Sequence, residues 1–157
     1  MNSMQPFCKE SATMDEQIKE HLKRLNKYYL YLRDARKIPL ETFVDDALHY
    51  GSTERFLQLA IESCLNIGNR LISLYQFKKP VDPPETYADI FSAMQQIGVL
   101  DYEFSQKLRN MAKFRNRLVH LYWEIERKLI YQFIQEDLED FKVFERKVVD
   151  FLMNNPI

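Results

Sequence analysis

The sequence predicts an all-α fold, an antiparallel helical bundle of four main helices plus a short helix. Three Gly and six Pro occur in 157 residues, so long segments contain no residue that interrupts a helix. Apolar residues recur in these segments at spacings of three and four, which is the period of a helix face. Alternation of polar and apolar residues, the pattern of a half-buried strand, is not evident. These patterns favour helices over a sandwich with many turns.

The first two helices are predicted by their caps and their apolar faces. Asp15 can cap the first helix, and Pro39 ends it because proline cannot continue a helix. A short mixed segment then leads to Gly51. Ser52 can cap the second helix, which we expect over Ser52–Gln76. The residues expected to be buried are Ile18, Leu22, Leu25, Tyr29 and Leu32 in the first helix, and Phe56, Leu59, Ala60, Ser63, Ile67, Leu71 and Leu74 in the second.

The remaining helices follow a loop over residues 78–85 that contains three prolines. A short helix is expected over residues 86–97, with Gly98 as its C-terminal stop. Asp101 can cap the next helix. One last helix is expected over residues 126–151. The apolar positions that define these three helices are Ile90, Phe91, Met94 and Ile97, then Phe104, Leu108, Met111, Ala112 and Val119, then Ile130, Phe133, Ile134, Leu138, Phe141, Phe144, Val148 and Phe151.

Length and composition limit the class of protein. The chain is most simply one domain, which we expect at residues 15–157 after a flexible N-terminal leader at residues 1–14. No apolar run approaches the roughly 18 residues that a membrane span needs, and no signal-peptide pattern is present, so we expect a cytoplasmic protein without membrane contact. Cys8 and Cys64 are too few for a disulfide framework or a zinc site. Cys64 lies in an apolar helix and is expected to be buried, and neither metal nor other cofactor is expected.

A basic run marks the helix that follows Asp101. Residues 105–123 contain no Asp or Glu, on a chain whose formal net charge is −1. A patch of one sign on a nearly neutral protein attracts ions of the other sign, and polyphosphate backbones are the commonest such partner. The basic residues of the run are Lys107, Arg109, Lys113, Arg115 and Arg117.

An Arg, a His and a Tyr stand at fixed spacing inside this run. His120 follows Arg115 by five positions, which on a continuous helix places the two residues about 140° apart. They converge only if the helix ends near His120, and Tyr122 and Trp123 would then begin a turn. Two interpretations are open. His120 caps a helix C-terminus, where a cationic imidazole is favoured, with Tyr122 half-buried in the core; or the three residues act on a phosphate.

Glu62 and Asn66 stand one turn apart on the second predicted helix. The simpler interpretation is a solvated helix edge, since polar pairs at this spacing usually stabilise a helix surface. The alternative is an inner polar pair that holds the side chain of Arg115 from across the bundle.

The motif segment Phe114–Trp123 resembles that of the HepT-like ribonuclease toxins of the HEPN superfamily, the higher eukaryotes and prokaryotes nucleotide-binding domain. The similarity extends to Glu54–Glu62 and to Gly98–Leu100, and it covers roughly residues 15–152. The resemblance implies a HEPN-like α-helical bundle, which agrees with the fold predicted from periodicity.

The resemblance also implies a metal-independent endoribonuclease, with Arg115 and His120 as its catalytic pair. Asn116, Glu62 and Asn66 would support that pair, and the other basic residues of the run, Lys107, Arg109, Lys113 and Arg117, would contact RNA. A His near its ordinary pKa can move protons at neutral pH, and an Arg can stabilise an anionic phosphorus centre. One His cannot easily act on both sides of phosphorus, and the resemblance implies a homodimer whose two motifs face each other across one cleft.

An inactivating partner is the last implication of the resemblance. The family's toxins are neutralised by a minimal nucleotidyltransferase antitoxin that AMPylates the motif tyrosine, here Tyr122. Each AMP adds a negative charge and bulk beside Arg115 and His120. Two alternatives stay open: a non-catalytic HEPN module that binds nucleotide or serves as an assembly subunit of a nucleotidyltransferase, and a plain helical dimerisation protein. The second leaves the acid-free basic run unexplained.

Overall fold

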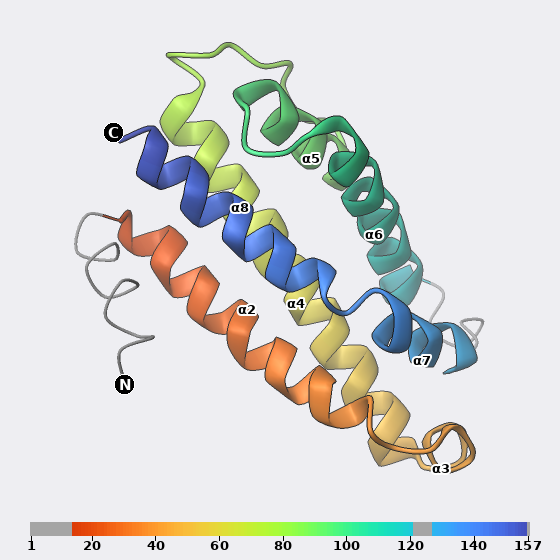
Figure 1. Cartoon of the computed structure of the whole chain (residues 1–157). Helices are drawn as coiled ribbons and strands as arrows, with labels where there is room; N and C mark the ends of the chain where they lie inside the picture. The colour runs from red at the N-terminus through yellow and green to blue at the C-terminus, as the bar shows by residue number, and fades with distance from the viewer. Residues whose placement is uncertain (1–13, 121–126, 157) are drawn as a thin grey trace, which may run out of the picture.

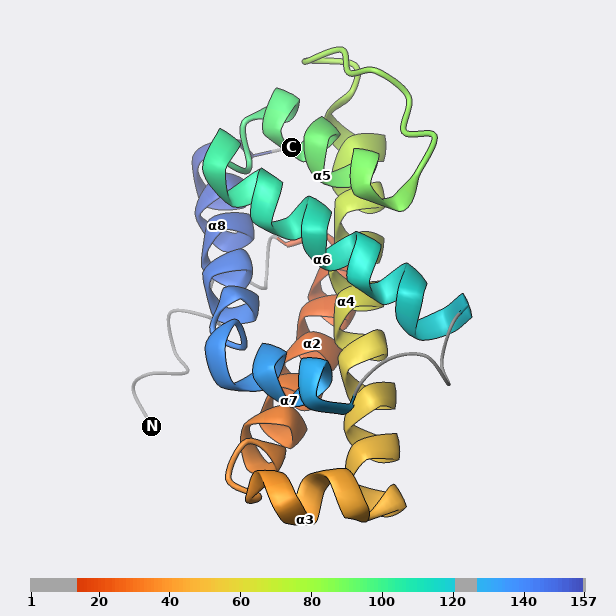
Figure 2. The same cartoon turned by 90° about the vertical axis from the view of Figure 1, so that its right-hand side faces the viewer.

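The computed structural model describes residues 14–120 and 127–156 and arranges them as a helical bundle (Figure 1). These residues form seven α-helices and no strand, which confirms the all-α prediction. Helices α2 (Glu16–Ala35) and α4 (Ala47–Tyr75) run antiparallel, and the short α3 (Leu40–Asp45) connects them. Helices α5 (Tyr87–Ile97) and α6 (Tyr102–His120) form a second pair, in which α6 crosses over α4 (Figure 2).

The N-terminus of α2 is fixed by Asp15, as the sequence predicts. Its Oδ1 accepts the backbone N–H groups of Gln17 at 3.0 Å and Ile18 at 3.1 Å. The same carboxylate accepts Arg70 Nη2 at 2.7 Å, which ties the start of α2 to α4. The predicted face of α2 is buried in full: Ile18, Leu22, Leu25, Tyr29 and Leu32.

Helix α4 begins earlier than predicted. Its N-cap is Asp46, whose Oδ1 accepts the Leu48 N–H at 2.9 Å. Ser52 is therefore not a cap; it lies inside the helix and donates its hydroxyl to the Leu48 carbonyl. The start predicted at Ser52 is wrong because the helix tolerates Gly51, whose surroundings are open. The core face also differs from the predicted one: Leu57, Ile61 and Leu65 are buried as well, whereas Phe56, Leu59 and Leu74 are only partly buried.

Both boundaries of α5 follow the prediction. Thr86 forms a capping box with Asp89, and Gly98 ends the helix in the left-handed conformation with φ 104°. Asp101 then caps α6 by accepting the Phe104 N–H at 2.8 Å. Helix α5 lies so close to α4 that a Cβ on Gly68 would stand 2.5 Å from Ile90 Cγ2. This close approach sets the position of α5, and with it one wall of the site described below.

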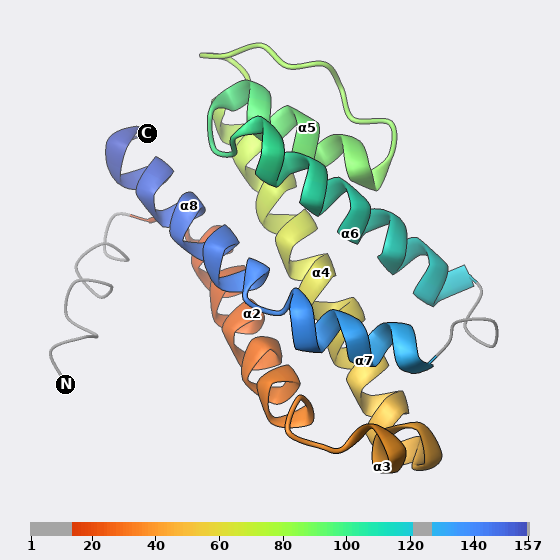
Figure 3. The same ribbon diagram turned by 45° about the vertical axis from the view of Figure 1, so that its right-hand side comes forward.

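The single helix predicted over residues 126–151 is two helices, α7 (Arg127–Glu136) and α8 (Asp140–Asn154) (Figure 3). Residues 137–139 form the turn between them. Leu138 is buried in the core, and Glu139 accepts the Tyr29 hydroxyl at 2.7 Å. Both contacts fix the turn, so the chain bends here although no Gly or Pro signals it.

The hydrophobic core reaches both ends of the described chain. Met14, at the end of the expected leader, is buried with it, as is Phe151 of α8. Cys64 is buried as predicted, and that burial raises the pKa of its thiol. Within residues 14–120 and 127–156, no helix is both long enough and apolar enough to cross a membrane.

Candidate functional site

Arg115 extends from α6 toward α4. Its Nη2 donates to Glu62 Oε1 at 2.6 Å, and its Nη1 donates to Asn116 Oδ1 at 3.4 Å. The guanidinium carbon lies 4.8 Å from the centre of the Tyr87 ring, within the range of a cation–π contact. Only 13% of the side chain is exposed, and Nε is buried with no hydrogen-bond partner among the described residues. Three elements, α4, α5 and α6, therefore hold this guanidinium.

Glu62 holds Arg115 from across the bundle, as the less simple of the two interpretations predicted, whereas the exposed Asn66 only lines a pocket with it. Glu62 forms the ion pair and also accepts Gln58 Nε2 at 3.4 Å. A pocket of about 240 Å³ is lined by Glu62, Asn66, Asn69, Tyr87 and Arg115. The interpretation of Glu62 as a merely solvated edge is therefore wrong, and Asn66 is an exposed side chain at the rim of the same pocket.

His120 is the last described residue of α6 and is exposed. It lines a second pocket, of about 580 Å³, together with Asn116. Tyr87 and Asn69 line both pockets, so Arg115 and His120 open on two adjoining pockets that share a wall. Tyr122 and Trp123 lie outside the described residues, and the turn expected there stays a prediction.

The basic run is less uniform than its sequence suggests. Lys107 Nζ lies 3.1 Å from Asp140 Oδ1 of α8, and Arg109 Nη1 lies 3.3 Å from Asp89 Oδ1 of α5. Arg115 is paired with Glu62. Three of the five predicted basic residues thus meet carboxylates on other helices. Lys107, Lys113 and Arg117 are exposed, and of these Lys107 is the one paired with a carboxylate among the described residues.

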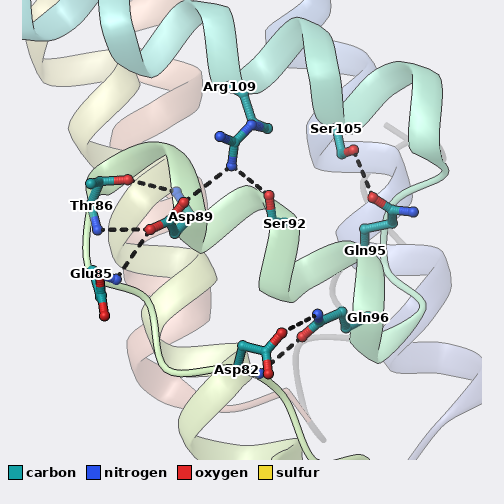
Figure 4. Close-up of polar contacts among 9 residues, drawn as sticks. All are labelled: Asp82, Glu85, Thr86, Asp89, Ser92, Gln95, Gln96, Ser105 and Arg109. Atoms are coloured by element: carbon teal, nitrogen blue, oxygen red, sulfur yellow. Dashed lines mark hydrogen bonds and ion pairs between the residues drawn. The ribbon is translucent and has the colours of Figure 1, made fainter.

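A polar network fixes the N-terminus of α5, where Tyr87 is the first residue of the helix (Figure 4). Asp89 Oδ2 accepts the backbone N–H of Thr86 at 3.1 Å, and Thr86 Oγ1 accepts that of Asp89 at 3.2 Å. Arg109 donates to both Asp89 and Ser92. The Thr86 hydroxyl, followed by the Arg109 guanidinium, lowers the pKa of Asp89, which therefore stays ionised at neutral pH.

No cluster of three or more His, Cys, Asp or Glu side chains that could hold a metal ion occurs in the part of the chain that the structure describes. The polar groups gathered at the two pockets are instead one guanidinium, one imidazole, two carboxylates, two hydroxyls and three amides. Such groups suit the binding of an anion and the transfer of protons.

A family model described as ribonuclease HepT-like matches residues 18–148. The chain belongs to the HepT-like ribonuclease family. Two relatives fall in the same family by name. The tRNA nuclease HepT of Aphanizomenon flos-aquae (strain 2012/KM1/D3) is 23% identical over 136 residues, which cover 87% of this chain and 90% of the relative. The mRNA nuclease HepT of Shewanella oneidensis is 30% identical over 88 residues, which cover 56% of this chain and 63% of the relative.

A solved structure shares the HepT-like fold. It is a tri-AMPylated Shewanella oneidensis HEPN toxin in complex with an MNT antitoxin, with a TM-score of 0.76 and 23% identity. The alignment covers 86% of this chain and 98% of that toxin. At this level of identity the likeness shows the fold.

Sequence reasoning missed two members of this HepT-like site, Tyr87 and Asn69. Tyr87 stands after the proline-rich loop, and nothing in its local pattern indicates that it packs against Arg115. Asn69 follows Asn66 by three positions on α4, so the helical spacing that singled out Glu62 and Asn66 could have extended to it.

Proposed function

We propose that this chain is the toxin of a toxin–antitoxin pair and that it cleaves RNA endonucleolytically with Arg115 and His120. Membership of the HepT-like ribonuclease family supports this activity. The observation that carries the proposal is the placement of Arg115 and His120 on two adjoining pockets with a common wall. Arg115 supplies fixed positive charge there, and the imidazole of His120 can accept or donate a proton.

The reaction uses the ribose 2′-hydroxyl as the nucleophile. A base takes its proton, the 2′-oxygen bonds to phosphorus, and the bond from phosphorus to the 5′-oxygen breaks as an acid protonates that oxygen. The products are a 2′,3′-cyclic phosphate and a 5′-hydroxyl. His120 performs one of the proton transfers, and His120 of a second copy performs the other, because the two act on opposite sides of phosphorus. This chemistry needs no metal ion.

Arg115 stabilises the extra negative charge that forms on the phosphorus oxygens. A guanidinium carries five N–H donors, and the contacts to Glu62 and Asn116 use two of them. Of the other three, the Nε–H is buried, which leaves the second N–H of Nη1 and of Nη2 for phosphate oxygens. Glu62 fixes the orientation of the forked guanidinium group, so Arg115 is already ordered before RNA binds.

Exposed cations of α6 attract the RNA backbone. Lys113 and Arg117 are exposed and lie within one turn of Arg115 along the helix. Lys107 and Arg109 are engaged by Asp140 and Asp89, so we expect them to contribute less to RNA binding.

Control by a partner is proposed through Tyr122, which stands two positions after His120. A nucleotidyltransferase antitoxin would transfer AMP from ATP to the tyrosine hydroxyl with release of pyrophosphate. The new phosphodiester charge would compete with RNA for Arg115. The tri-AMPylated toxin from Shewanella oneidensis, bound to its MNT antitoxin, supports this proposal by similarity of fold. Incubation with ATP, magnesium and the antitoxin should raise the mass of the wild type and not that of Tyr122→Phe.

The deciding experiment is induced expression of the wild type, His120→Ala and Arg115→Ala in the absence of antitoxin. Growth arrest and RNA decay should occur with the wild type alone, and the purified protein should cut RNA in the presence of EDTA. A purified dimer that binds nucleotide, never cuts RNA and is harmless on expression would instead support a non-catalytic assembly subunit. Full cleavage by His120→Ala would exclude the proposed mechanism.

A further inference from the structure

The larger of the two pockets has room for more than a phosphate. Its volume of about 580 Å³ falls within the roughly 300–1,000 Å³ typical of sites for small organic molecules. Its walls come from three helices and the loop before α5, and they include Asn69, Pro84, Tyr87, Ile90, Asn116 and His120. Because Tyr87 and Asn69 also line the pocket of Arg115, a group bound here lies next to any phosphate that Arg115 and His120 engage.

The chemistry of the lining matches that of an unpaired nucleobase. Tyr87 is 46% exposed and offers an aromatic ring, while Pro84 and Ile90 add apolar surface. Asn69 and Asn116 carry amides, each with both a donor and an acceptor. Proteins recognise single-stranded RNA by stacking bases on aromatic rings and by hydrogen-bonding the edges of those bases. The pocket contains both kinds of group.

The position of Tyr87 is fixed independently of any ligand. It is the first residue of α5, directly after the Thr86 cap. Asp89 holds Thr86 and is itself held by Arg109 of α6 (Figure 4). The Arg115 guanidinium lies against the same ring. A surface ordered before binding loses little freedom when it binds, so Tyr87 is a prepared platform.

We propose that this pocket binds an unpaired nucleobase next to the scissile phosphate, with the base stacked on Tyr87. The inference rests on the proposed function, because Arg115 and His120 are what locate the phosphate. It assigns a base-binding subsite beside the phosphate to the larger pocket. A base in a duplex must first be unpaired and unstacked before it can enter the pocket.

The test measures binding without cleavage, on a His120→Ala background. Short single-stranded RNAs that differ only in the position of one abasic nucleotide are titrated against this protein and against its Tyr87→Leu derivative by fluorescence anisotropy. With Tyr87 present, one abasic position should weaken binding about 10-fold. With Tyr87→Leu, the intact RNA should bind as weakly as that abasic RNA, and removal of the base should have no further effect.

Two results would refute the proposal that this pocket binds a base. One is that Tyr87→Leu weakens intact and abasic RNAs by the same factor, which would mean that Tyr87 acts only through Arg115. The other is that no abasic position changes the affinity for RNA. Tyr87→Phe keeps the aromatic ring and should bind RNA as tightly as the His120→Ala protein. Tyr102→Leu removes a different tyrosine, 64% exposed at the start of α6, and should also leave RNA affinity unchanged. Thermal unfolding checks that each variant is folded.

Cleavage by the wild type is measured separately, so that the two proposals can fail independently. Base-dependent binding without any RNA cleavage would refute the proposed nuclease and leave the pocket standing. Cleavage without base-dependent binding would refute the pocket alone.

Discussion

Glu62 Oε1 accepts a 2.6 Å hydrogen bond from Arg115 Nη2, which joins α4 to α6 across 53 positions of sequence. The two side chains are 30% and 13% exposed. Removing the carboxylate would leave a mostly buried guanidinium without its counter-charge. We expect Glu62→Ala to lower the free energy of unfolding by about 1–3 kcal/mol, and Glu62→Gln by less because it keeps an acceptor. Urea denaturation measures the difference.

An exposed pair on α2 provides the control for Glu62. Glu20 Oε1 lies 3.8 Å from Arg24 Nε, and both side chains are more than half exposed. Glu20→Ala should leave the free energy of unfolding within about 0.5 kcal/mol of the wild type. Equal effects of Glu20→Ala and Glu62→Ala would mean that the Glu62 pair is an ordinary surface contact.

The fork of Arg115, rather than its charge alone, should be required for RNA cleavage. Arg115→Lys keeps one positive charge but cannot donate to Glu62, Asn116 and a phosphate in the same geometry. We expect kcat to fall about 100- to 1,000-fold, the loss seen when one donor to a developing oxyanion is removed. Single-turnover cleavage assays measure it, and a Lys variant with wild-type kcat would show that the fork is dispensable.

The two glycines of α4 should respond to alanine with opposite signs. A Cβ at Gly68 would stand 2.5 Å from Ile90 Cγ2 and 2.9 Å from Met94 Sδ, so Gly68→Ala forces α5 away from α4. We expect a loss of about 1–3 kcal/mol in the free energy of unfolding. Gly51 has nothing within 4 Å, and Gly51→Ala should gain about 0.5–1 kcal/mol from helix propensity.

These glycine variants are compared by chemical denaturation. Gly68→Ala should also weaken RNA binding, because α5 carries Tyr87. A Gly68→Ala protein as stable as the wild type would contradict the close helix contact, whereas destabilisation by Gly51→Ala would contradict the continuous α4.

Acid should remove the stabilisation that Asp15 provides. Its hydrogen bond with Arg70, together with the backbone bonds from Ile18 and Gln17, lowers the Asp15 pKa below the ordinary 3.8. A carboxylate whose pKa falls on folding stabilises the folded state above its unfolded pKa, and that stabilisation is lost as pH falls through the folded pKa. Asp15→Asn keeps a good N-cap but loses the charge. The difference in free energy of unfolding between wild type and Asp15→Asn should therefore be full at neutral pH and shrink below pH 3.8.

The salt dependence of RNA binding should separate Lys113 and Arg117 of α6, which pair with no carboxylate among the described residues, from Lys107, which pairs with one. Each phosphate contact to a single strand adds about 0.7 to the slope of log affinity against log salt concentration. Lys113→Gln and Arg117→Gln should each lower the magnitude of that slope by about this amount. Lys107→Gln, whose parent residue pairs with Asp140, is the matched control. If Lys107→Gln changed the slope as much as Lys113→Gln or Arg117→Gln, Lys107 would also contact a phosphate of the RNA.

Local signals predicted much of the fold. The Asp15 and Asp101 caps and the Gly98 stop each depend on a few neighbouring residues, and all three are found where expected. The break before α8 was missed because Leu138 continues the apolar period, and only its contact partners reveal the turn. The start predicted at Ser52 is wrong because Asp46 caps α4 and Gly51 lies inside it, where the helix tolerates a glycine.

Local sequence signals also predicted part of the candidate site. Helical spacing placed Glu62 on one face, and the structure brings it to Arg115. It could not reveal that Arg109 is engaged by Asp89, or that Tyr87 covers Arg115, because these contacts join different helices. Charge counted along one helix ignores the carboxylates that other helices bring to it, so the sequence overstated the basic surface.

Arg115 and His120 both belong to α6, which follows α2, α4 and α5 in the chain. During translation the N-terminal part of a chain emerges from the ribosome first and can fold first. A nascent chain that ends in the loop before α5 can already pair α2 with α4, yet it carries neither side chain. On the proposed function, translation itself delays toxicity until α6 emerges, and products that terminate before residue 115 are harmless however well they fold.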